Sequence, residues 1–287
     1  MLLVIDVGNT NTVFGLFSDG DGDGDAPALV THWRVETRHA RPGDEYAALL
    51  HSFAAADATL AGRRPLAELV HDVIIVSVVP QTRFPLEQLC TRWLGRAPLE
   101  VVTGGARALG ISAPAAAQGI DPGMPILLDD PRSVGADRVV DAVAAHAEDR
   151  ARRGLVIVDM GTATTFNVVS PAGEYLGGAI APGIHLAADA LTAHAAKLPK
   201  VQIAPPPDAV GKNTVHAMQS GLFWGYVGLV DGVVARILAS LSFQPRVLAT
   251  GGLAPLVARE SKTIEAVDQM LTLRGLELVY RRHKQGG

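Results

Sequence analysis

One pattern limits the folds that this chain can adopt, because it occurs twice. In each copy an apolar run ends at an aspartate, and a glycine follows two positions later. The first copy is MLLVIDVGNTNTVFGLF at 1–17, and the second is LVIVDMGTATTFNVV at 155–169. Each copy is typical of two β-strands joined by a short turn. The copies align as follows: Asp6 with Asp159, Gly8 with Gly161, and Thr10–Asn11 with Ala163–Thr164.

These turns carry residue types that suit phosphate chemistry. A carboxylate at the tip of a buried strand is costly unless it has a function. Glycine lets the backbone approach a ligand, and turn N–H groups and small hydroxyls hold phosphate oxygens. The carboxylate can hold a divalent metal that bridges phosphates, directly or through water. Either copy alone is equally consistent with a plain β-turn, but the matched pair favours two turns that cradle a nucleotide's triphosphate.

The rest of the chain repeats the same organisation. Periodicity predicts strands at 28–37, 71–80, 98–104, 164–170, 173–181, 246–251 and 264–269, and helices at 45–60, 84–94, 133–153, 183–197, 214–241 and 272–283. A meander of three strands, followed by alternating helix and strand, therefore occurs once in each half. This duplication predicts two α/β domains, 1–132 and 133–287, with a cleft between them. The segment 19–27 is expected to be a surface loop, and 106–131 a long active-site connection or an edge.

Composition places the chain among ordinary globular proteins. Of its 287 residues, 48% are hydrophobic and 19% charged, and the net charge is -4. This mild acidity gives no reason to expect nucleic acid or an anionic membrane as a partner. The lone Cys90 suits a reducing compartment. The start of the chain lacks the basic region of a signal peptide, and no run of roughly 18 uninterrupted apolar residues predicts a membrane span. We therefore expect a cytoplasmic protein.

A third glycine-rich turn, TGGLAP, follows the predicted strand at 246–251 and contains Gly251 and Gly252. Such a turn suits the adenosine and α-phosphate end of a nucleotide, although taken alone it is explained as a simple strand-to-helix turn. The stretch GKNT at 211–214 is not a P-loop, because Pro206 stands where that motif needs glycine. No GxGxxG follows the first strand, which disfavours a dinucleotide fold.

The amino-acid sequences of several motifs resemble those of the type III pantothenate kinases. These are related to the Bvg accessory factor and lie within the superfamily of actin, sugar kinases and heat-shock ATPases. The motifs, in family order, are DVGNTNT at the start, VGADR at 134–138, DMGTATTF at 159–166, GGAIAPG at 177–183, GKNT with AMQSG at 211–221, and ATGGLAP at 249–255.

The resemblance implies duplicated actin-like ATPase (ribonuclease H-like) domains, each a mixed sheet flanked by helices. It also implies ATP-dependent phosphorylation of pantothenate to 4'-phosphopantothenate, the first step of coenzyme A biosynthesis. The implied cofactors are ATP, Mg²⁺ and a monovalent cation, potassium or ammonium. The implied assembly is a homodimer with the substrate site near the interface.

The resemblance also assigns residues. The expected ATP contacts are Asp6, Val7, Gly8, Asn9, Thr10, Asn11, Thr12, Val13 and Thr162, to which the third turn adds Gly251 and Gly252. The expected substrate contacts are Leu128, Gly135, Ala136, Asp137, Arg138 and Thr214. Asp137 falls on the catalytic base and Asp159 on the site of the monovalent cation. Without the resemblance, an Asp near a helix start is commonly a solvated, dipole-friendly residue.

Two positions depart from the family pattern. Leu128 stands where the family often has a tyrosine, and Asn167 ends a motif that usually reads TTFD. Leu128 leaves room for a related phosphotransferase with another alcohol substrate. Asn167 leaves room for a nucleotide-binding regulator that has lost catalysis, although retention of all three aspartates argues for an enzyme.

A final pattern concerns association of subunits. In the predicted helix at 214–241, glycines are spaced three or four apart at Gly221, Gly225 and Gly228, which permits close approach of another helix. Trp224 and Tyr226 on the same helix are expected to pack in a core or a dimer seam. We interpret this helix as a subunit interface.

Overall fold

A computed structural model describes residues 1–20, 27–103, 118–195 and 197–286 of the chain. Most of the predicted loop at 19–27 and about half of the segment 106–131 lie outside these residues. The chain forms two compact units. Unit 1 comprises Met1–Met124, Asp129–Ala144 and Thr272–Gly287, and unit 2 comprises Pro125–Leu128 and Ala145–Leu271.

Unit 1 is built on a six-stranded mixed sheet with the order β3-β2-β1-β4-β5-β6. The strands are β1 (Leu2–Val7), β2 (Asn11–Phe17), β3 (Leu29–Glu36), β4 (Asp72–Ser77), β5 (Leu99–Val101) and β6 (Gln118–Ile120). The first three strands form an antiparallel meander, and β4 runs parallel to β1. Alternate residues of β1, such as Leu3 and Ile5, face one side of the sheet and are fully buried there.

Helices cover both faces of this sheet. Helices α1 (Gly43–Ala56) and α3 (Arg83–Gln88), with the π-helical turn Leu89–Trp93 that continues α3, share one core with β1 and β2. Helix α8 (Leu271–Gly286) lies against the other face, since a Cβ on Gly15 would stand 3.1 Å from Leu273 Cδ1. Short elements complete the unit: 3₁₀ turns at Ala58–Leu60, Pro80–Thr82 and Pro131–Ser133, and helix α2 (Leu66–Leu69). Helix α4 (Ala136–Glu148) begins in unit 1.

Unit 2 repeats this plan in a five-stranded sheet with the order β11-β10-β7-β8-β9. Its strands are β7 (Leu155–Met160), β8 (Ala163–Val169), β9 (Tyr175–Pro182), β10 (Arg246–Thr250) and β11 (Ala266–Val267). The order β9-β8-β7-β10-β11 matches β3-β2-β1-β4-β5. Both sheets begin with an antiparallel meander, and β10 runs parallel to β7 as β4 runs parallel to β1. The predicted duplication of topology is therefore confirmed.

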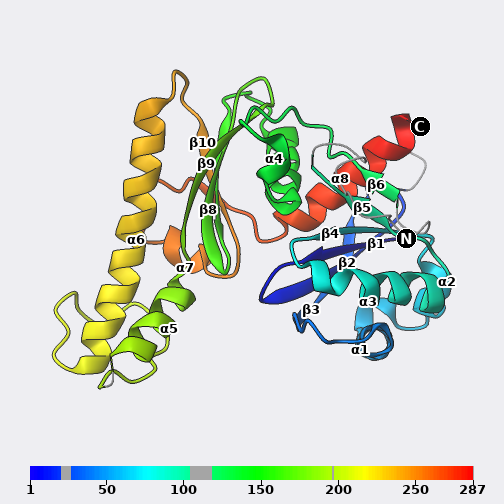
Figure 1. Cartoon of the computed structure of the whole chain (residues 1–287), viewed down its shortest axis with the longest axis horizontal. Coiled ribbons are helices and arrows are strands. Elements are labelled where there is room, and N and C mark those ends of the chain that lie inside the picture. Colours follow the sequence, from blue (N-terminus) through cyan, green and yellow to red (C-terminus); the bar gives the residue numbers. More distant parts are fainter. Residues whose placement is uncertain (21–26, 104–117, 196, 287) are drawn as a thin grey trace. The chain divides into compact units, whose positions relative to one another are not determined.

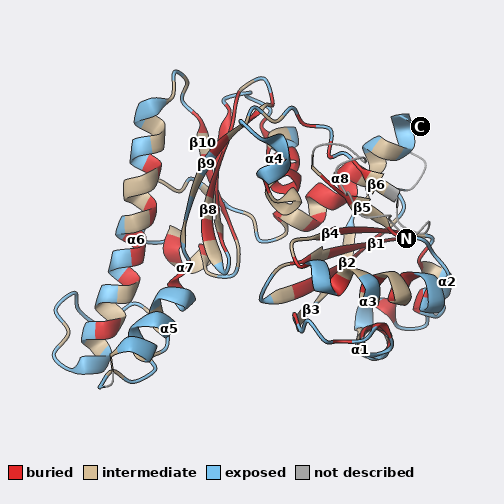
Figure 2. Ribbon diagram, viewed as in Figure 1, coloured by how far each residue is buried: buried red, intermediate tan, exposed pale blue. Residues whose placement is uncertain are grey.

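The helices of unit 2 are α5 (Ile184–His194), α6 (Thr214–Ser240) and α7 (Ala254–Ala258). Helix α6 runs alongside the second sheet (Figure 1), and Phe223, Val230 and Val234 pack with Val156 and Val158 of β7 in one core. Figure 2 shows that buried residues concentrate on the strands, whereas part of α6 is exposed. Among the described residues, α6 is also the one helix long and apolar enough to cross a membrane by length and composition. The absence of a membrane span therefore stays a prediction.

Most predicted elements are present, with differences at their ends. The helix expected at 133–153 begins at Ala136, because a 3₁₀ turn capped by Asp130 precedes it. The helix expected at 45–60 ends at Ala56, because the Asp57 side chain accepts the N–H of Thr59 and starts a separate turn. The compact units also differ from the predicted division at residue 132, since α8 packs in unit 1; that division into two actin-like ATPase domains stays a prediction.

Candidate functional site

The first Asp-Gly turn closes the β1–β2 hairpin of unit 1. Asp6 lies half-buried near the end of β1, and the Gly8 N–H donates to the Asn11 carbonyl at 3.0 Å. Asn9 and Thr10 at the tip are exposed, whereas Val7, Thr12 and Val13 are buried. Of the predicted ATP contacts in this stretch, Asn9 and Thr10 therefore have side chains that a ligand can reach, and the buried residues offer at most their backbone.

Thr37, which directly follows β3, holds this turn from the side. Its N–H donates to the Thr10 carbonyl at 2.9 Å, and its hydroxyl donates to the Gly8 carbonyl at 2.8 Å. The Thr12 hydroxyl lies 2.9 Å from the same Thr37 oxygen. Thr37 is not among the site residues predicted from the sequence. The only signal for it was the meander itself, which returns the third strand to the hairpin tip.

The second Asp-Gly turn closes the β7–β8 hairpin of unit 2. Asp159 is half-buried, while Gly161 and Thr162 are exposed at the tip. The Gly161 N–H donates to the Ala163 carbonyl at 3.1 Å, and the Gly183 N–H donates to the Thr162 carbonyl at 3.2 Å. A Cβ on Gly183 would collide with the carbonyls of both tip residues, so the glycine is required for this close contact.

The pairing of strands within the two hairpins corrects the predicted alignment of their turns. Val7 pairs with Thr12 in the first hairpin, and Met160 pairs with Thr164 in the second. The first turn is thus one residue longer, and Thr12, rather than Asn11, occupies the place of Thr164. Both threonines are fully buried and hydrogen-bonded to another hydroxyl. A gapless comparison of the sequences missed the extra residue because both turns begin with the same Asp-x-Gly spacing.

The third glycine-rich turn lies directly beside the second within unit 2. Strand β10 pairs with β7 so that Thr250 is opposite Asp159. Gly251 adopts φ +92°, and a Cβ there would stand 2.9 Å from Asp159 Oδ1 and 2.7 Å from the Met160 carbonyl oxygen. A carboxylate and a main-chain carbonyl therefore converge on Gly251. These hard oxygen donors suit a cation such as potassium, so the residues fit the implied monovalent ion.

Asp137 lies in the first turn of α4, in unit 1. Its Oδ1 accepts the N–H of Arg138 at 2.8 Å. A Cβ on Gly135 would stand 2.5 Å from that oxygen, so glycine leaves the space that the carboxylate occupies. Burial raises the pKa of Asp137, and the N–H and the positive charge of Arg138 offset only part of this increase. A half-buried carboxylate with a raised pKa suits a general base.

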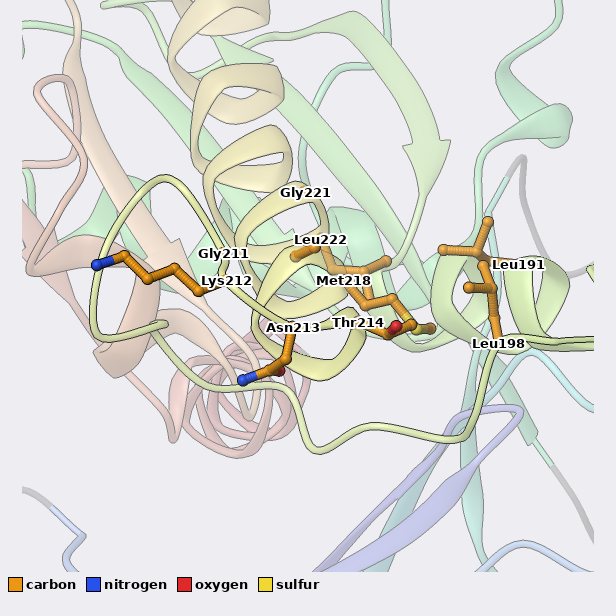
Figure 3. A pocket seen from close by; sticks show the side chains of 10 residues that line it. Leu191, Leu198, Gly211, Lys212, Asn213, Thr214, Met218, Gly221 and Leu222 are labelled. Atoms are coloured by element: carbon orange, nitrogen blue, oxygen red, sulfur yellow. The ribbon is translucent and has the colours of Figure 1, made fainter.

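The predicted substrate residue Thr214 lies at the start of α6, next to the helix cap Asn213, whose side chain accepts the His216 N–H. It lines a cavity of about 680 Å³ in unit 2 (Figure 3). The lining is mostly apolar; it comprises Leu191, Leu198, Gly211, Lys212, Asn213, Thr214, Ala217, Met218, Gly221 and Leu222. In Figure 3 the Lys212 side chain points away from Leu191 and Met218. Leu128, the other predicted substrate residue in this unit, lies beside Gly177 of β9 rather than in this lining.

The second departure, Asn167, lies inside β8 and is fully buried. Its Oδ1 accepts the Tyr175 hydroxyl at 2.8 Å, and its amide donates to the Thr165 hydroxyl at 3.1 Å. The amide thus serves a buried hydrogen-bond pair within the sheet, and its exposure to solvent is 0%.

Comparison with solved structures identifies the fold. A crystal structure from Campylobacter jejuni, described as a Baf family transcriptional activator, has a TM-score of 0.54 at 16% identity and covers 99% of both chains. One from Sinorhizobium meliloti, described as a 2-dehydro-3-deoxygalactonokinase, has a TM-score of 0.55 at 15% identity and also covers 99% of both chains. This likeness shows the duplicated α/β fold of the actin-like ATPases and sugar kinases.

Comparison of sequences identifies the family. A family model described as type III pantothenate kinase matches residues 2–236. A type III pantothenate kinase of Anaeromyxobacter sp. strain K is 50% identical over 284 residues, covering 99% of this chain and all of that protein. The one from Myxococcus xanthus is 47% identical over 283 residues, covering 99% of each chain. The chain described here therefore belongs to the type III pantothenate kinase family.

Proposed function

We propose that this chain transfers the γ-phosphoryl group of ATP to the primary hydroxyl of pantothenate, giving 4'-phosphopantothenate and ADP. This is the first step of coenzyme A biosynthesis. The observation that carries the proposal is the match to type III pantothenate kinases along 99% of the chain at 50% identity. Identity at that level along the full length of a relative described as a type III pantothenate kinase supports the same reaction for this chain.

In this proposal Asp137 is the base. Its carboxylate accepts a hydrogen bond from the substrate hydroxyl and takes the proton as the new oxygen–phosphorus bond forms. The bond between the γ-phosphorus and the β,γ-bridging oxygen breaks, and ADP leaves with that oxygen. Because the transition state is loose, the proton moves late. The bond from the Arg138 N–H holds one carboxylate oxygen in place, and the Arg138 guanidinium binds the substrate or supports developing charge.

The ATP phosphates bind at the Asp-Gly turns. The tip of the first turn, residues 9–11, supplies backbone N–H groups, and Asp6 lies beside it. In unit 2, Thr162 contacts phosphate, and Gly251 and Gly252 contact the adenosine end. Bound Mg²⁺ and a monovalent cation supply positive charge to the phosphate chain, and Asp159 holds the monovalent cation. The convergence of Asp159 and the Met160 carbonyl on Gly251 supports that assignment.

The substrate contacts are Leu128, Gly135, Ala136, Asp137, Arg138 and Thr214, and the working form is a homodimer associated through α6. Gly221, Gly225 and Gly228 support this assembly, because a Cβ on any of them would have no atom within 4 Å. Trp224 on the same helix is 36% exposed. The protein is expected in the cytoplasm, without nucleic acid or membrane as partner.

A coupled assay of ADP release tests the function. We expect ADP from Mg-ATP only when pantothenate is added, with the rate reduced when potassium and ammonium are left out. Release only with a different alcohol would replace the substrate while keeping the enzyme class. Nucleotide binding without turnover, for any alcohol tested, would contradict the proposal and identify a regulator. Equal rates with sodium and with potassium would contradict the monovalent-cation site.

A further inference from the structure

Two hydrogen bonds at the first turn fix the directions of the hydroxyl protons of Thr12 and Thr37. The Thr37 hydroxyl has a single proton, and that proton goes to the Gly8 carbonyl at 2.8 Å. The Thr12 hydroxyl must therefore be the donor in the 2.9 Å contact with Thr37. Thr12 is fully buried and Thr37 is 9% exposed. The result is a one-way chain from Thr12 through Thr37 to the backbone of the turn, in which each bond strengthens the next.

This chain sets how the turn faces a ligand. The peptide bond after Gly8 is trans, so its carbonyl and the N–H of Asn9 point in opposite directions. Because the Gly8 carbonyl is turned toward Thr37, the Asn9 N–H is turned away from it, at the exposed end of the hairpin. The Thr10 carbonyl is also engaged by Thr37. Two carbonyl oxygens that would repel a phosphate, those of Gly8 and Thr10, are thus held aside, and the Asn9 N–H, which attracts one, is presented.

The equivalent residue of unit 2 shows which of these contacts is special. Gly183 follows β9 as Thr37 follows β3, and its N–H likewise donates to the tip of the hairpin, at the Thr162 carbonyl. The backbone bond is therefore common to both units. Gly183 has no side chain, so it cannot make the hydroxyl bond that Thr37 makes to the Gly8 carbonyl.

A second contact keeps Thr37 in position. The guanidinium of Arg41 donates to the Glu36 carbonyl at 2.8 Å and to the Glu45 carboxylate at 3.0 Å, and it lies over the ring of Tyr46. Arg41 is only 6% exposed. Since Glu36 directly precedes Thr37, this anchor ties the end of β3 to α1 and leaves Thr37 little freedom to move away from the turn.

We propose that Thr37 is a positioning residue for ATP, which acts by orienting the peptide groups of the turn at residues 8–11 toward the phosphates. The inference rests on the proposed function in one respect, that this turn binds ATP phosphates. Thr37 itself does not touch the nucleotide. Loss of its hydroxyl frees the Gly8 carbonyl to rotate toward the ligand side, so the effect is specific to ATP and does not extend to pantothenate.

The test compares Thr37→Val, which keeps the shape and the backbone N–H, with Thr37→Ser, which restores the hydroxyl. The matched control is Thr82→Val, since Thr82 is a buried threonine of unit 1 whose hydroxyl also donates to a carbonyl, that of Val79 at 2.8 Å. Affinity for Mg-ATP is measured by calorimetry without pantothenate, and KM for each substrate by ADP release. We expect Thr37→Val to weaken ATP affinity and raise KM for ATP by about tenfold, with KM for pantothenate within about twofold of wild type.

Thr37→Ser and Thr82→Val are expected to bind ATP within about twofold of wild type. An unchanged ATP affinity in folded Thr37→Val, or an equal loss in Thr82→Val, would overturn the inference. If Thr37→Val does not fold, Thr12→Val takes its place; it removes only the donor to Thr37 and should weaken ATP affinity by about threefold, and no loss would overturn the inference. Failure of the proposed function shows separately, as wild-type protein that binds ATP but releases no ADP with pantothenate.

Discussion

Asp137 combines two properties that a base for an alcohol needs, a raised pKa and a fixed orientation. Replacing it with asparagine keeps its shape and removes the proton acceptor. We predict that Asp137→Asn lowers kcat by about 10² or more, the usual loss for a positioned base, while KM for ATP changes little. The measurement is steady-state ADP release. Asp121→Asn is the control, because Asp121 is exposed and bonds only to its own turn at Gly123 in the described contacts. Near-normal turnover in Asp137→Asn would remove the base assignment.

The same carboxylate predicts a pH dependence. Burial raises its pKa above the ordinary value of 3.8, against the opposing effect of Arg138. The base works only when ionised, so kcat/KM stays level above the folded-state pKa and falls as the pH drops through it. We predict an acid limb centred above pH 3.8 in a profile of kcat/KM for pantothenate. Circular dichroism over the same range separates this limb from acid unfolding. A limb at or below 3.8 in folded protein would contradict the prediction.

Some residues of the candidate site were predicted from the sequence, and others were not. Asp6, Asp137 and Asp159 were found because a carboxylate in an apolar run or a known motif is visible in one dimension. Thr37 was not found, because its role depends on the register of β2 against β3, which sets a threonine beside a turn 25 residues earlier in the chain. The role of Arg41 was hidden for the same reason, since its anchor is a backbone carbonyl.

At the scale of elements, α6 is tied to the loop after α7 by one side chain. Asp231 accepts hydrogen bonds from the hydroxyls of Ser261 and Thr263 at 2.6 and 2.8 Å and from the Lys262 N–H at 3.0 Å. We predict that Asp231→Ala lowers the free energy of unfolding by about 1–3 kcal/mol, because three donors lose their acceptor. Urea denaturation at neutral pH measures the change. Asp208→Ala, at an exposed position, is expected to leave stability within about 0.5 kcal/mol.

The pH dependence of this tether has a definite sign. Burial alone would raise the pKa of Asp231, but the Lys262 N–H and the two hydroxyls lower it below 3.8 overall. A lowered folded-state pKa contributes stability that is fully present above pH 3.8 and is lost as the pH falls through the folded-state value. The difference between wild type and Asp231→Ala should therefore shrink below pH 3.8. A difference that stays constant or grows there would show that the charge of Asp231 is not what holds the loop.

Elements differ in how far the sequence determines them. The central strands of both sheets were predicted because short apolar runs bounded by turn residues are typical of buried strands. Helix α6 was predicted as a long helix, and its 27 residues are mostly apolar and contain no proline. Two short elements were missed, strand β6 with three residues and helix α2 with four, because elements of that length show no period by themselves. Strands β5 and β11 are as short, but they lie within the strands predicted at 98–104 and 264–269. The switch from α3 to a π-helical turn at Leu89–Trp93 likewise has no signature in the sequence.

In the whole molecule, five strands of each sheet follow the same order, but the residues around the turns differ between the two units. Unit 1 contains the candidate base and a turn held by a threonine hydroxyl, whereas unit 2 contains Asp159, the Gly251 turn and the exposed part of α6. Duplication supplies two similar turns, and different residues surround them in the two units. The residue that follows the third strand, Thr37 in one unit and Gly183 in the other, is the clearest such difference.

The proposed homodimer gives the last prediction. Gly225 lies on the exposed side of α6, and a Cβ there would meet no atom within 4 Å. A larger residue is thus accommodated by the isolated subunit, and leucine in place of glycine also favours helix by up to about 1 kcal/mol. Against a second subunit packed on this helix, the same side chain would collide. We predict that Gly225→Leu is folded, with a melting temperature no lower than that of wild type, yet elutes as a monomer at micromolar concentration in size-exclusion chromatography with light scattering.

Loss of the dimer should also affect the substrate, because Thr214 begins the same helix. We expect kcat/KM for pantothenate to fall in Gly225→Leu, while affinity for Mg-ATP remains near wild type. Gly286→Leu is the matched control, since Gly286 is an exposed helical glycine of α8 with equally open space around its Cβ position; it should leave both assembly and kinetics unchanged. Wild-type protein that is monomeric at micromolar concentration would refute the α6 interface. A dimeric Gly225→Leu would place the interface elsewhere on the surface, because no two helices could then approach closely at this glycine.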